Sequence, residues 1–250
     1  RDNSGWELYR VAEDFAECNN VADQYPEVLQ ELISTWYVEA GKHGVLPLDG
    51  PNPARFATPR PQIATDLERY IYYPDTQSVP ESAAVKVLNR PHVIAAVVDI
   101  PKGGAEGVLL SHGGNSGGYT LFVQDGKLHY LHNYVGSQHF LLTSDEEVPI
   151  GHVILSYEFE VSGPPDLKNG RGAPGVGKLF FNEKLVGQME LPVTMPLTIS
   201  IDEGLTCGRD PGSPTTDLYQ PPFVFTGTLH RVAVDVSGER IEDHEAEIRM

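Results

Sequence analysis

The sequence is poor in cysteine, in basic residues and in long apolar runs. Its two cysteines, Cys18 and Cys207, are too few for a disulfide framework or a zinc cluster, and we expect two free thiols rather than a bridge. Lys and Arg total 18 against 35 Asp and Glu, a formal net charge of −17. Proteins that bind nucleic acid or anionic membranes carry a basic face, so we expect neither partner. No apolar run approaches the roughly 18 residues of a membrane span.

The beginning of the chain also lacks two common features. It has no initiator Met, and no charged and then apolar leader precedes Trp6. We therefore expect either that a leader was removed or that the chain is an internal fragment.

One amphipathic helix is expected near the beginning. Pro26 suits a first helical position, because it lacks an N–H and its φ is preset. Apolar residues then recur at 3.6-residue spacing up to Gly41 and Gly44, which end the helix. Trp6–Tyr9 has the composition of a strand. We expect the stripe formed by Leu29, Leu32, Ile33 and Trp36 to need a partner surface that this chain does not supply.

The composition and the turn spacing of the rest of the chain predict a β-sandwich. Gly (25) and Pro (20) are abundant, and turn signals recur about every ten residues. Asp125-Gly126 predicts a tight hairpin, Asn182-Glu183 predicts a weaker one, and 162–177 predicts a long flexible loop. The strands are expected at 69–73, 92–100, 105–112, 118–124, 127–134, 138–143, 152–160, 177–182, 184–190, 196–201 and 225–236.

These patterns divide the chain into four parts. Residues 1–48 form a strand and helix, 49–65 a Pro-rich linker, 66–236 an antiparallel jelly-roll sandwich, and 237–250 a charged tail. The expected fold class is mainly β, with a strand–loop–helix segment before it.

Catalytic motifs are incomplete. Glu158 and Glu160 share a strand face, but the central Asp and the final Glu of a laminarinase-type site are both missing, so we expect a solvated face. Ser116 lies in a Gly-rich turn followed by a strand, whereas a hydrolase nucleophile precedes a helix. His129 and His132 point to opposite faces, and no His-x-His or HExxH occurs, so we expect no histidine metal site. We assign no catalytic residue.

One acidic segment could hold calcium. Asp202, Glu203, Asp210 and Asp217 lie in or beside a Pro/Gly-rich loop, and carboxylates on loops are how proteins hold this ion. The alternative is an ordered surface loop whose side chains cap backbone groups. We keep Asp202, Asp210 and Asp217 as candidate metal ligands and otherwise expect no metal or cofactor in this chain.

Four segments of the sequence resemble parts of bacterial arylsulfatases. "WELYRVAEDFAECNNVADQYPEVLQEL" resembles the end of their catalytic domain, and "GKHGVLPLDG" resembles the exit from it. The segments from "YYPDTQSVPES" to "HNYVG" and from "GRDPGSPTTDLYQ" to "RVAVDV" resemble the concanavalin-like sandwich appended to many of these enzymes.

The resemblance implies a non-catalytic C-terminal region of a sulfate ester hydrolase. Neither cysteine lies in the Cys-x-Pro-x-Arg motif that yields the formylglycine nucleophile of sulfatases. The nucleophile, the calcium and the sulfate contacts would all lie in a catalytic part outside this chain. The expected partners are that catalytic domain or copies of this chain, with the sandwich as a cover, a site entrance or an oligomerisation surface. The compartment would be bacterial cytoplasm or periplasm.

The alternative function is a lectin-like carbohydrate-binding module that presents a glycan or a sulfated substrate. Tyr119, Tyr130, Tyr134 and Phe140 offer rings for stacking on sugars, although these rings alternate with core positions. The acidic balance disfavours sulfated ligands. A stand-alone hydrolase on a jelly roll is the third hypothesis.

Overall fold

The structure, a computed structural model, describes residues 5–46, 48, 67–201 and 203–238. The chain forms two compact units, Arg1–Arg55 and Phe56–Met250. The predicted linker (49–65) and most of the predicted charged tail (237–250) lie outside the described residues.

The first unit is a helix with a turn-rich segment folded against it. Helix α1 (Pro26–Lys42) begins at the predicted proline. Trp6 packs edge-on against Trp36, with ring centroids 5.6 Å apart. The predicted strand at Trp6–Tyr9 is wrong: the backbone of Leu8 pairs with the loop, accepting the Val21 N–H and donating to the Asn20 side chain.

The expectation of an uncovered helix stripe is only partly met. Ile33 is 1% exposed, and Leu29 and Trp36 are half-buried. Leu32 remains 51% exposed. The turn-rich segment that carries Trp6 therefore covers part of the surface that we expected an absent partner to cover.

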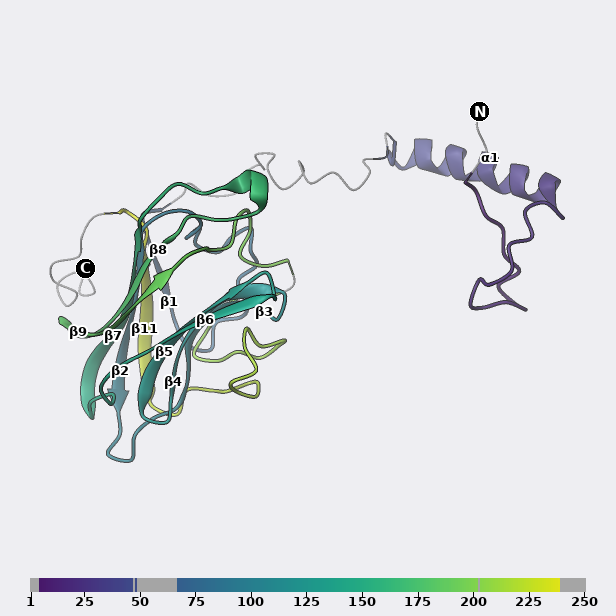
Figure 1. The fold of residues 1–250 in the computed structure, drawn as a ribbon. Helices are drawn as coiled ribbons and strands as arrows, with labels where there is room; N and C mark the ends of the chain where they lie inside the picture. The colour runs from purple at the N-terminus through teal and green to yellow at the C-terminus, as the bar shows by residue number, and fades with distance from the viewer. Residues whose placement is uncertain (1–4, 47, 49–66, 202, 239–250) are drawn as a thin grey trace. The chain divides into compact units, whose positions relative to one another are not determined.

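The second unit is a sandwich of two antiparallel sheets (Figure 1). The six-stranded sheet runs in the order β1 (Arg69–Tyr72), β11 (Thr228–Asp235), β2 (His92–Ile100), β7 (Gly151–Val161), β8 (Gly175–Phe181) and β9 (Lys184–Leu191). The five-stranded sheet runs in the order β10 (Leu205–Cys207), β3 (Gly107–Gly114), β4 (Gly117–Gln124), β5 (Lys127–Tyr134) and β6 (Gln138–Thr143). The predicted fold class, a mainly-β concanavalin-like jelly roll, is confirmed.

Side chains that alternate along the strands build the core between the sheets. On β2, Ile94, Ala96 and Val98 belong to the inter-sheet core, whereas Val93, Ala95 and Val97 lie on the outer face. Tyr130 from one sheet stacks on Tyr157 from the other, with ring centroids 3.4 Å apart. Aromatic rings thus join the two layers at their centre.

The tight turns follow their sequence signals. Asp125 and Gly126 have φ angles of 50° and 71°, as the hairpin between β4 and β5 requires. The Gly-rich segment around Ser116 is the turn between β3 and β4, as expected. The loop predicted at 162–177 is shorter, because β8 begins at Gly175, and it carries the 3₁₀ helix η1 (Leu167–Asn169).

The predicted strand at 196–201 is wrong. Thr198 and Ile199 bond to the Glu81 carboxylate instead of to a neighbouring strand. The strand of this region is β10, which pairs with β3 a few residues later. No helix in the described part of the chain has the length and apolar character that crossing a membrane requires.

Candidate binding pocket

An open pocket of about 360 Å³ lies at one end of the sandwich, beside β10. Its rim includes Ile201, which is 70% exposed. Polar and apolar atoms both contribute to its surface, and it is lined by Ser78, Pro80, Glu81, Ser200, Ile201, Glu203 and Gly204.

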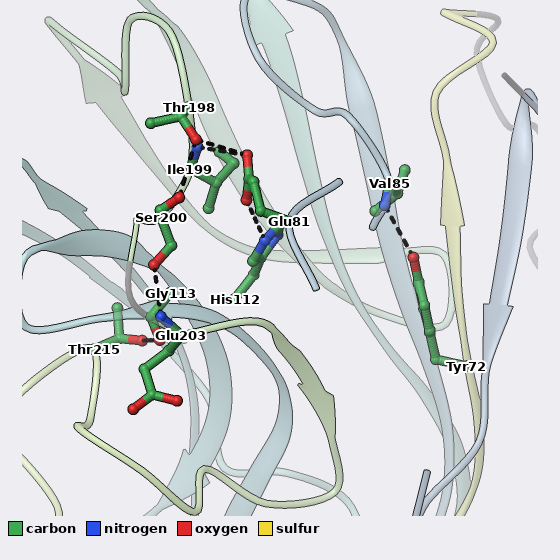
Figure 2. Close-up of polar contacts among 10 residues, drawn as sticks. All are labelled: Tyr72, Glu81, Val85, His112, Gly113, Thr198, Ile199, Ser200, Glu203 and Thr215. Atoms are coloured by element: carbon green, nitrogen blue, oxygen red, sulfur yellow. Dashed lines mark hydrogen bonds and ion pairs between the residues drawn. The ribbon is translucent and has the colours of Figure 1, made fainter. Parts of the chain in front are cut away.

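Backbone pairing brings the two walls of the pocket together. Val79 and Leu205 exchange two N–H···O bonds of 2.8 Å. A Cβ atom on Gly204 would lie 2.4 Å from the Val79 carbonyl oxygen, so this position needs glycine for the close approach. On the other side, the Val85 N–H donates to the Tyr72 hydroxyl and anchors the segment that carries Glu81 (Figure 2).

Glu81 is held in one orientation by three neighbours (Figure 2). One carboxylate oxygen accepts the Thr198 hydroxyl at 2.9 Å and the Ile199 N–H at 3.1 Å. The other lies 2.7 Å from Nε2 of His112, whose side chain is 1% exposed. Burial raises the pKa of Glu81, but the contacts with His112 and Ile199 outweigh it, so that this pKa lies below its usual value.

The second acidic residue of the pocket, Glu203, is fixed by its own loop. Its N–H donates to the Ser200 hydroxyl oxygen at 3.0 Å, and its carboxylate accepts the Ser213 N–H at 3.1 Å. Figure 2 shows the Glu203 carboxylate pointing away from the Glu81 carboxylate. Two carboxylates that diverge do not flank one bond or enclose one ion, so this arrangement suits neither a two-carboxylate hydrolase nor a shared metal ion.

Two of the three predicted calcium candidates, Asp210 and Asp217, lie among the described residues. Asp202 lies outside the described residues, and Asp217 is exposed. Asp210 is 3% exposed, and its carboxylate accepts the Tyr219 hydroxyl at 2.6 Å and the Ser111 hydroxyl at 3.1 Å. The Thr215 N–H is a third donor, at 3.4 Å. Asp210 therefore accepts hydrogen bonds from its own loop and from Ser111 of β3, in line with the alternative interpretation, an ordered loop.

That loop covers the outer face of the five-stranded sheet. Tyr219 and Phe223 pack with Val108, Phe122 and Leu131 in a separate apolar cluster. The Val108 N–H donates to the Phe223 carbonyl, which ties the loop to β3. A ligand therefore cannot lie directly on this part of the sheet.

Two of the four rings suggested for sugar stacking are in the interior, and the other two are half-buried. Tyr119 and Tyr130 are buried in the inter-sheet core. Tyr134 is half-buried, and its hydroxyl donates to the Gly170 carbonyl. Phe140 is also half-buried. These rings do not form an exposed stacking platform.

The acidic and histidine residues considered on predicted strands lie on the strand faces that the alternation of side chains predicts. Glu158 and Glu160 lie on one face of β7, and Glu160 pairs with Lys178. His132 is buried, whereas His129 contacts Thr143 on the opposite face. The pocket residues Glu81 and Ser200, and His112 behind Glu81, were missed, because no local motif marks residues this far apart in sequence.

The loop contains a buried aspartate, Asp210, and an exposed one, Asp217, whose substitutions can be compared. We expect Asp210→Ala to lower the free energy of unfolding by about 2–3 kcal/mol, because it removes the acceptor of three buried donors. Asp217→Ala should change it by less than about 0.5 kcal/mol. Urea unfolding measures both, and equal effects would contradict the role of Asp210.

The effect of Asp210 should also depend on pH. Burial raises its pKa, although the Tyr219 hydroxyl and the Thr215 N–H act in the opposite direction. Its contribution to stability is then largest below the unfolded-state pKa near 3.8, and it falls as the pH rises through the folded-state pKa. The free energies of unfolding of wild type and Asp210→Ala should therefore become more similar as the pH is raised.

The class of protein that the second unit defines is a concanavalin-like β-sandwich. The sequence matches no protein-family model, and no curated protein matches it. Among solved structures, it is similar to the CBM40 module of a Ruminococcus gnavus IT-sialidase bound to α2,3-sialyllactose (TM-score 0.44, 14% identity, 72% of this chain and 92% of that chain).

Two other solved structures show similar values. The mouse laminin α1 domains LG4-5 give a TM-score of 0.41 and 10% identity over 70% of this chain and 40% of that chain. A SAP-like pentraxin from Limulus polyphemus gives a TM-score of 0.36 and 15% identity over 69% of this chain and 75% of that chain. Likenesses of this size do not assign a function, so the ligand has to be inferred from the chain's own pocket.

Proposed function

We propose that the sandwich is a non-catalytic binding module that takes an uncharged, hydroxyl-rich ligand, such as a neutral sugar, in the pocket between Glu81 and Glu203. The observation that carries this proposal is the composition of the pocket. Glu81, Glu203, Ser78 and Ser200 line the same open space as the apolar residues Pro80 and Ile201. Sugars present both hydroxyls and C–H faces, and mixed surfaces of this kind can contact both.

The charge of the pocket selects among sugars. The described residues that line it include Glu81 and Glu203 and no Lys or Arg. A sulfate or carboxylate group on the ligand would be repelled, and the net charge of −17 adds to that repulsion. We therefore expect neutral oligosaccharides to bind and sulfated or sialylated ones to be excluded.

The test is a panel of neutral, sulfated and sialylated oligosaccharides titrated into the purified chain by calorimetry. We expect saturable binding of at least one neutral member and none of the charged members. Binding only of charged members, or of no member at millimolar concentration, would contradict the proposal.

Two exposed isoleucines provide the matched control. Ile201→Ala removes an exposed apolar side chain at the pocket rim and should weaken binding several-fold without changing stability. Ile150 is similarly exposed, just before β7, and Ile150→Ala should leave binding unchanged. Equal binding by the two variants would place the ligand elsewhere.

A second candidate function comes from the sequence blocks that resemble arylsulfatases. In that proposal the sandwich is the accessory part of a sulfate ester hydrolase and serves as a cover or an oligomerisation surface. The ordered agreement of the blocks supports it. The purified chain should then hydrolyse no aryl sulfate above a heat-killed control, and turnover above that control would reject it.

A further inference from the structure

We propose that Asp99, His152 and His230 form a binding site for a divalent transition-metal ion of the zinc type on the outer face of the six-stranded sheet. Nδ1 of His152 lies 2.7 Å from one carboxylate oxygen of Asp99, and Nε2 of His230 lies 2.6 Å from the other. The ligand atoms of the three residues all lie within 4.8 Å of one another. This proposal is independent of the sugar pocket, because the two sites share no residue.

Three neighbouring strands fix the positions of these side chains. Asp99 on the central strand β2 lies directly opposite His152 on β7. On the other side, Thr228 of β11 is opposite Asp99, and the register shifts between Leu229 and Arg231. The extra residue of this β-bulge is His230, whose side chain reaches Asp99 from the third strand. The strands therefore hold the backbone of the site in place without a flexible loop.

The spacing of the donors fits a small ion. Zinc bonds of about 2.0–2.2 Å in a tetrahedron place neighbouring ligand atoms about 3.3 Å apart. The observed contacts of 2.6 and 2.7 Å are slightly shorter, and the side chains are partly exposed, so small rotations would open the required space. The centroids of the two imidazole rings lie 5.8 Å apart, and the ring planes are inclined by 54°.

The donor set selects the kind of ion. Two imidazole nitrogens and one carboxylate suit Zn²⁺ and its neighbours in the transition series, whereas Ca²⁺ prefers six to eight oxygens. Three protein ligands leave the fourth position of the tetrahedron for water or for a donor from a bound molecule. Because the cluster is exposed, its hydrogen bonds add little to stability, and the fold does not require them.

The experiment uses chelator-treated chain without an affinity tag. Zinc chloride is titrated by calorimetry, with calcium chloride in parallel, and cobalt(II) is added to a second sample to record its visible spectrum. We expect one saturable zinc site per chain, no calcium binding at the same concentrations, and the absorption bands of four-coordinate cobalt. Absence of a saturable zinc site, or a calcium affinity equal to that for zinc, would overturn the proposal.

Variants identify the ligands. His152→Ala and His230→Ala should each weaken zinc binding at least tenfold, since loss of even an outer-shell partner costs 10–100-fold. His139→Ala, an exposed histidine on β6, and Cys18→Ser, the exposed thiol, should bind as wild type does. Circular dichroism checks that every variant is folded. Unchanged binding in both His152→Ala and His230→Ala would place the ion elsewhere and refute the site.

Discussion

Acidification from pH 7 to pH 5 should lower the free energy of unfolding by about 4 kcal/mol, because two histidines are buried in the core. Burial lowers the pKa of His92 to about 4 and that of His132 to about 3, from 6.5. The unfolded chain then takes up protons at both residues below pH 6.5, and the folded chain does not. At 1.36 kcal/mol per pH unit, each histidine contributes about 2 kcal/mol over this range.

The surroundings of His132 explain why its neutral form is required. Its Nε2 accepts the Met195 N–H at 3.1 Å, so a proton on this nitrogen would break the bond. Tyr119, Tyr157 and His92 line the same small inter-sheet cavity, and the cavity includes no carboxylate that could stabilise an imidazolium. The contribution of the two neutral histidines to the free energy of unfolding should therefore be complete above pH 6.5. It should be lost as the pH falls towards their folded-state pKa values.

Urea unfolding at pH 7, 6 and 5 measures this slope. His132→Gln keeps an acceptor for the Met195 N–H but does not titrate, so it should remove about half of the loss. His139→Asn replaces an exposed imidazole, so its free energy of unfolding should fall between pH 7 and pH 5 by as much as that of wild type. If the His132→Gln slope equals that of wild type, the buried histidines are not its cause.

Much of the sandwich could be predicted because its signals are local. The bounds predicted for β2, β5 and β6 are those observed, since the residues alternate between faces and turn signals lie beside them. The Asp125-Gly126 turn needs only two residues with positive φ. Secondary structure of this kind is determined within ten residues of sequence.

The wrong strands show where local signals fail. Residues 196–201 have strand composition, but Glu81, more than 100 residues away, takes the hydrogen bonds of Thr198 and Ile199. Trp6–Tyr9 has the aromatic and apolar content of a strand, but the described residues of its own unit include no strand for it to pair with. A strand needs a partner, and composition does not reveal whether the fold supplies one.

Both candidate sites depend on contacts of the same long range. Asp99 lies 53 residues from His152 and 131 from His230, so no spacing rule could join them. The expectation that the chain holds no histidine metal site considered only histidines close in sequence. The register of β11, β2 and β7, and the bulge at His230, are what bring the three side chains together.

Gly107→Ala should lower the free energy of unfolding by about 3–5 kcal/mol, because β3 begins where the chain passes closest to the covering loop. Gly107 has a φ of 123°, and a Cβ atom there would lie 2.3 Å from Cα of Phe225. Backbone strain and overpacking each cost about 1–3 kcal/mol. Gly104 also has a positive φ, 82°, but its Cβ would meet no atom within 4 Å, so Gly104→Ala isolates the strain. Thermal and urea unfolding should show the Gly107 variant as clearly the less stable of the two. Equal losses would mean that the loop yields at Phe225, and that the close approach of the two backbones does not hold the loop on the sheet.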